Sequence, residues 1–213
     1  MKTRSKALLL TLCAVLLVAA SVLGTMAYLT STDTVTNTFT VGSVAIKLDE
    51  AQANTDGTLV PNAERVKANS YKLLPGHTYS KDPMVTVLSG SEPSYVKMTV
   101  TFSKANELDA IFAPGGADLT KIFNGYDPAN WTYKDNTTDV TANTRTYEFW
   151  YKEAVGAPDG DVALDALFDS ITVPGSVTKE QLATIEGMTI TVNAYAIQAD
   201  GFADAGAAWA AFN

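Results

Sequence analysis

The stretch 94–103, SYVKMTVTFS, decides the fold class of this chain. Val96, Met98, Val100 and Phe102 alternate in it with lysine and threonine. A period of two is typical of a β-strand that turns one face to the core and the other to water. A helix would instead place its apolar residues three and four apart. The stretch therefore predicts a half-buried strand.

Similar patterns predict further strands, and turn-forming residues separate them. The other expected strands lie at residues 44–48, 85–87, 147–151 and 188–198. Proline and glycine cluster at 74–76, 89–93 and 114–116, as expected for turns between strands. The expected fold is mainly β, a jelly-roll-like β-sandwich with short helical insertions.

Two short helices are expected as insertions. Residues 161–170 place Leu164, Leu167 and Phe168 on one helical face. Thr178 and Gln181 have the spacing of a capping box, which predicts a helix from there through Ile185.

Length and composition limit the class of protein. The chain has 213 residues, 46% of them hydrophobic, which suits one globular domain with an appendage. Its 15 basic and 23 acidic residues give a net charge of -8, which argues against a nucleic-acid binder. A single cysteine rules out a disulfide framework.

The N-terminus has the pattern of a secretory signal peptide over residues 1–27. Three basic residues precede an apolar run at 7–23, and small residues follow it. We expect cleavage between Ala27 and Tyr28, so that the protein contacts a membrane only through this segment before processing. Retention of the segment as an anchor is the alternative. Cys13 lies inside the run, so the mature chain would contain no cysteine.

No catalytic, cofactor-binding or metal-binding residues are predicted. His77 is the only histidine, and a lone histidine in a turn is typical of surface decoration rather than of a zinc or triad site. No glycine-rich phosphate loop is present. Paired acids for glycoside hydrolysis remain possible because their separation is a spatial quantity.

Two groups of residues could either bind a ligand or have a purely structural role. Four aspartates between 159 and 169 could hold calcium, or could simply favour a helix N-terminus capped by Asp161. Aromatic residues between 131 and 151 could form a sugar or peptide platform, or could belong to the core. These are Trp131, Tyr133, Tyr147, Trp150 and Tyr151.

Four blocks together resemble the TasA and camelysin family of exported biofilm-matrix proteins. The blocks are GTMAYLT at 24–30 with NTFTVGSV at 37–44, LPGHTYSKDPMVTV at 74–87, PSYVKMTV at 93–100, and ITVNAYAIQA at 190–199 with Trp209 close behind. The resemblance implies removal of the leader by a SipW-type signal peptidase, export to the extracellular matrix or cell surface, and a jelly-roll domain over 44–213. It also implies fibre formation, with the protein itself as partner and a matrix accessory protein as a possible second one.

The resemblance implies a donor strand at residues 28–43, which would add to the next subunit. This segment is rich in threonine and valine and carries one charge, so it suits an extended strand. Leu29, Val35, Phe39 and Val41 would share one face of it. The alternative is that the segment forms the first strand of its own domain.

The sequence is compatible with two other functions. One is a secreted monomeric adhesion or ligand-binding sandwich that uses the aromatic middle region. The other is a camelysin-like metalloendopeptidase, which no zinc motif in the sequence supports, so we expect no enzymatic activity.

Overall fold

The computed structural model describes residues 3–28, 42–112 and 123–212. The chain divides into two compact units, Met1–Val41 and Gly42–Asn213. In the first unit the helix α1 spans Thr3–Tyr28 and so covers residues 3–27 of the predicted leader. Cys13 is exposed and unpaired. Across the described ranges, no helix has the length and apolar character needed to cross a membrane.

The second unit is mainly β, as the sequence predicts. Its strands are β1 (Ile46–Asp49), β2 (Thr78–Ser80), β3 (Met84–Val87), β4 (Ser91–Ser103), β5 (Trp131–Asp139), β6 (Thr144–Tyr151), β7 (Val155–Ala157), β8 (Val162–Ala163), β9 (Ser170–Thr172) and β10 (Ile190–Gln198). Its helices are α2 (Ala105–Phe112), α3 (Lys179–Thr184) and α4 (Ala205–Ala211).

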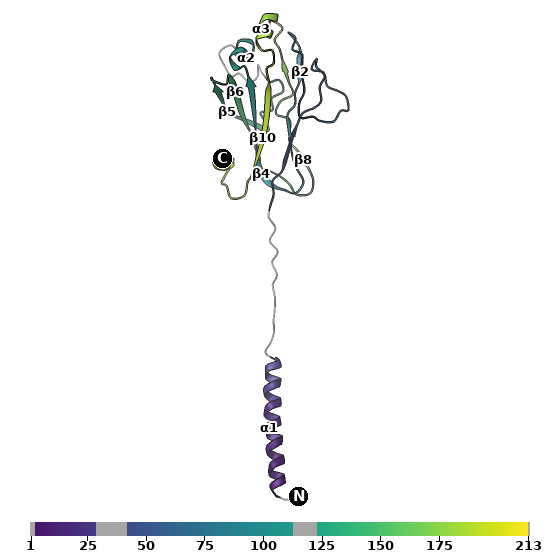
Figure 1. Ribbon diagram of the computed structural model, residues 1–213, viewed down its shortest axis with the longest axis vertical. Helices are drawn as coiled ribbons and strands as arrows, with labels where there is room; N and C mark the ends of the chain where they lie inside the picture. Colours follow the sequence, from purple (N-terminus) through teal and green to yellow (C-terminus); the bar gives the residue numbers. More distant parts are fainter. Residues whose placement is uncertain (1–2, 29–41, 113–122, 213) are drawn as a thin grey trace. The chain divides into compact units, whose positions relative to one another are not determined.

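The strands form three antiparallel sheets that do not close into a barrel. The largest has the order β10-β4-β6-β5, with β7 also pairing to β4. A second sheet has the order β1-β3-β8, and β2 pairs with β9. Figure 1 draws β5 and β6 to the left of β10, and β2 and β8 to its right. The strand predicted at 94–103 is thus the central partner of the largest sheet.

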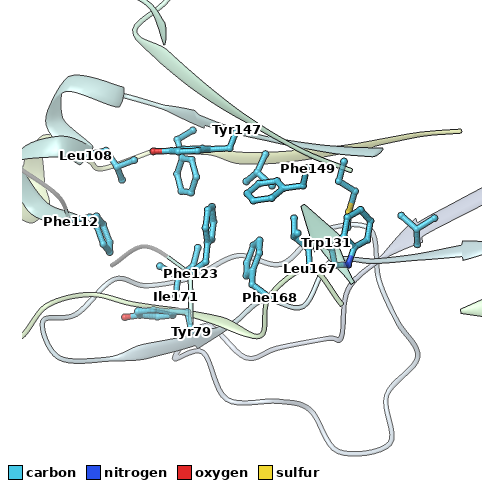
Figure 2. Close-up of a cluster of buried hydrophobic side chains, with 14 of the residues drawn as sticks. Tyr79, Leu108, Phe112, Phe123, Trp131, Tyr147, Phe149, Leu167, Phe168 and Ile171 are labelled. Carbon is cyan, nitrogen blue, oxygen red and sulfur yellow. The ribbon is translucent and has the colours of Figure 1, made fainter. Parts of the chain in front are cut away.

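The core lies between these sheets and is rich in aromatic rings. Val96, Met98 and Val100 of β4 are fully buried, as their alternation predicts. Phe123 packs edge-on against Tyr147 and Phe149 and lies 4.4 Å from Phe168, measured between ring centroids. Figure 2 shows Tyr147 and Phe149 facing Phe123, Phe168 and Ile171 across this layer. All residues of this core lie in the second unit.

The prediction of a helix over residues 161–170 is wrong. This segment contains β8, and the backbone that follows pairs with other parts of the chain. The N–H of Leu164 donates to Val85, that of Leu167 to Pro83, and that of Asp169 to Asn124. These partners fix an extended course, which still buries Leu164, Leu167 and Phe168. The apolar spacing therefore predicted correctly that these residues are buried, but it predicted the wrong secondary structure.

The predicted capping box is confirmed. Thr178 caps α3: its hydroxyl accepts from the N–H of Gln181, and the Gln181 side chain accepts from the N–H of Thr178. Ile185 follows as the C-cap residue and is buried.

An ion cluster holds the long connection between β1 and β2. Arg65 donates to Asp49 Oδ1 at 2.6 Å and to Asp82 Oδ2 at 2.8 Å. Burial by itself would raise the pKa of Asp49, but hydrogen bonds and charge from Lys47 and Arg65 hold it below its ordinary value. A buried pair, Lys81 with Glu50 at 2.5 Å, lies at the same end of the connection.

Candidate functional site: the free edge of β10

Strand β10 forms one edge of the largest sheet. It pairs with β4 through nine residues, from Ile190 opposite Phe102 to Gln198 opposite Ser94. The bonds from Ser103 to Thr189 and from Ala199 to Pro93 show that odd-numbered residues face β4. In an antiparallel pair both backbone groups of a residue point the same way, so even-numbered residues of β10 turn N–H and C=O toward the open edge. No backbone partner for them occurs within the described residues.

The apolar side chains of β10 are less buried than those of its neighbour. Ile190, Val192, Ala194 and Ala196 pack against the core but remain only half-buried. The core-facing residues of β4, in the same sheet, are buried almost completely. Strand β4 pairs with strands on both sides, whereas β10 pairs with β4 alone and has β1 of the second sheet close by without pairing to it. An added strand would cover the remaining apolar surface.

Apolar residues from other segments continue this surface. Tyr71, Leu73, Met188 and Ile190 line a cavity of about 30 Å³ with apolar walls, together with buried core residues. Burial, reinforced by the charge of Glu50, raises the pKa of Tyr71. The Tyr71 hydroxyl donates to the carbonyl of Ser80 at 2.6 Å, which anchors the segment around Tyr71.

The other sheet edges carry features that discourage pairing. Strand β5 has a bulge between Tyr133 and Asp135 and includes the charged residues Lys134, Asp135 and Asp139. Strand β1 contains Lys47 and Asp49, and β8 has two residues. Charges, bulges and short length are the usual protections of an edge. The sequence of β10, ITVNAYAIQ, has no charge, proline or glycine.

The chain enters the second unit at the far end of β10. Ser43 forms a parallel bridge with Ser91, and the N–H of Glu92 donates to its carbonyl. Strand β10 ends near this point, because Gln198 lies opposite Ser94. Residues 43–45 therefore run in the direction of β4 and opposite to β10.

The residues predicted to act in export and assembly all belong to the first unit, Met1–Val41. Ala27 and Tyr28 are the last two residues of α1. Leu29, Val35, Phe39 and Val41 fall outside the described residues. The strand at 188–198 was predicted, but its place at an edge was not. The absence of charge in it was the signal that could have indicated a pairing surface.

Two of the four aspartates bind separate partners through their side chains. Asp161 accepts from the N–H of Ser89, and Asp165 from the side chain of Asn130. Asp161 does not cap a helix, so the prediction that it caps a helix N-terminus is wrong. Within the described parts of the chain, no three histidine, cysteine, aspartate or glutamate residues gather as a metal site. His77 is exposed in its turn.

The aromatic residues of the middle region divide between core and surface. Trp131 and Tyr147 are fully buried, and Tyr133 packs against the core, so these three do not form a platform. Tyr151 also packs against the core, whereas Trp150 is half-buried and lines a separate cleft on the other face of the sheet.

Comparisons of the chain with protein-family models, with curated proteins and with solved structures gave no match.

Proposed function

We propose that this chain is a secreted structural subunit of an extracellular biofilm matrix. Residues 28–43 of one copy add as a strand to the β10 edge of the next copy, and repetition gives a fibre. The observation that carries the proposal is the long, uncharged edge strand with half-buried apolar side chains. The domain is then a jelly-roll-like sandwich that lacks one strand, in keeping with the family resemblance of its four sequence blocks.

The direction of the chain at residues 43–45 favours a second copy over the same one. A segment that enters beyond the end of β10 would have to reverse to lie along its own edge. A neighbouring subunit can accept it without that reversal. Such a head-to-tail contact does not close on itself, so it leads to filaments.

The chemistry of the donor suits the acceptor. Backbone groups of the donor would pair with those of Ile190, Val192 and Ala194, which supplies affinity. The apolar face predicted for Leu29, Val35, Phe39 and Val41 would meet the half-buried side chains of β10. Full burial of one phenylalanine or leucine contributes about 1.5–3 kcal/mol.

Processing would precede assembly. Cleavage between Ala27 and Tyr28 by a signal peptidase frees the donor segment from α1. A matrix accessory protein could start or anchor the fibre. We propose no catalytic role.

The proposal is tested by comparing two chains, 28–213 and 42–213, by electron microscopy and size-exclusion chromatography. We expect fibres from the first and monomers from the second. A synthetic peptide of residues 28–43 should bind the shorter chain in a one-to-one complex without causing growth. The same peptide with Phe39→Asp is the matched control and should not bind. Monomers from both chains at high concentration would reject the proposal and favour a monomeric binding protein.

A further inference from the structure

An open cleft of about 590 Å³ lies on the outer face of the β10-β4-β6-β5 sheet. Its floor comes from Tyr95 of β4 and Trp150 of β6, whose neighbours Val96 and Phe149 point into the core. The turn before α4 and the first residues of α4 form one wall and contribute mainly small residues. This volume lies in the range of ligand pockets, and β10 does not line it.

The aromatic floor is held in place by neighbouring groups. Trp150 Nε1 donates to Glu148 Oε1 at 2.6 Å. The Trp150 ring also lies 6.3 Å from the ring of Trp209, measured between centroids. Rings fixed in this way offer flat apolar surface with little ordering cost on binding. Such surface fits the apolar face of a sugar ring.

Two lysines stand beside this floor without an acidic partner. Lys134 Nζ lies 4.1 Å from the centroid of the Trp150 ring. The bulge after Tyr133 places it there, as bulges often re-aim a side chain toward a site. Lys152 Nζ donates to the carbonyl of Pro128 at 2.7 Å. Neither lysine forms an ion pair with any carboxylate of the described residues.

Carboxylates also border the cleft. Glu153 is exposed on the rim, and Asp204 accepts from the N–H of Ala207 through Oδ1. Carboxylate oxygens accept hydrogen bonds from hydroxyl groups but repel other acids. The cleft therefore combines flat rings, acceptors for hydroxyls and two lysines for a negative charge.

We propose that this cleft binds an acidic saccharide, a chain that contains uronic acid units. Their rings match the aromatic floor, their hydroxyls match Glu153 and Asp204, and their carboxylates match Lys134 and Lys152. An acidic peptide would satisfy the lysines but would lack hydroxyls for the two acids. The site does not depend on assembly, since it lies within one copy of the second unit.

The test is isothermal titration calorimetry of residues 42–213, which contain the whole described core. We expect hexagalacturonate to bind, and cellohexaose and hexaglutamate to bind about tenfold more weakly or not at all. Lys134→Gln with Lys152→Gln should weaken hexagalacturonate binding by about tenfold or more. Lys179→Gln, at an exposed lysine of α3, is the matched control and should leave it unchanged. Thermal melts establish that each variant is folded.

Three outcomes would overturn the proposal. The first is the absence of hexagalacturonate binding by the folded unit. The second is equal binding of hexaglutamate, which would mark an acidic-peptide site. The third is an equal loss of affinity in Lys179→Gln, which would indicate attraction to positive charge in general rather than to this cleft.

Discussion

The substitution Ala194→Pro should block pairing at the free edge of β10 while the domain stays folded. Ala194 lies opposite Met98 at a position where the β10 backbone points away from β4. Proline there removes an N–H that the monomer does not use and places its ring where an incoming strand would lie. Edge strands tolerate proline in this orientation. The monomer should therefore keep its fold.

The expected loss can be estimated from the hydrogen bonds. One backbone bond contributes about 1 kcal/mol net, and the ring also separates the adjacent one, so the interface loses about 2 kcal/mol. This loss raises the critical concentration for fibre growth about 30-fold. The assay is the monomer that remains after fibres of residues 28–213 are sedimented. Ala194→Gly keeps the N–H and is the matched control, with little expected change. If folded Ala194→Pro assembles at the original concentration, the β10 edge is not where subunits pair.

Three further predictions concern the donor and the domain. Phe39→Asp should raise the critical concentration about 100-fold or more, since a charge replaces an apolar ring at the interface, and sedimentation measures it. An unchanged value would remove Phe39 from the contact. Asp49 has a lowered pKa, so its contribution to stability is full above about pH 4 and is lost as the pH falls below it. In Asp49→Asn, the free energy of unfolding measured with urea should fall less steeply as the pH drops below about 4. An unchanged dependence on pH would argue against the contact with Arg65 as its cause. Thr178→Ala should lower the free energy of unfolding by about 1 kcal/mol through loss of the α3 cap, and no change would show that the cap is dispensable.

Local pattern was enough to predict the strands, because alternation follows from one face being buried. Val96, Met98 and Val100 lie where their period of two places them. The spacing of Leu164, Leu167 and Phe168 fits a helix equally well, and only the backbone partners at Val85 and Pro83 decide against it. Such partners are remote in sequence, so no local pattern reveals them.

The position of a strand within a sheet is likewise a long-range property. Residues 190–198 have strand character in the sequence, but their edge position depends on what pairs with β4. The division of aromatic residues has the same origin. Trp131 and Trp150 both lie on strands, and their opposite environments follow from the faces that β5 and β6 present.

Hydrogen exchange at the amides of β10 tests the central claim most directly. In the monomer, the N–H groups of Ile190, Val192, Ala194 and Ala196 face the open edge and should exchange rapidly, while odd-numbered residues are protected by β4. In fibres of residues 28–213, we predict that the even-numbered amides become protected as well. Fibres whose even-numbered β10 amides still exchange at the monomer rate would contradict the account.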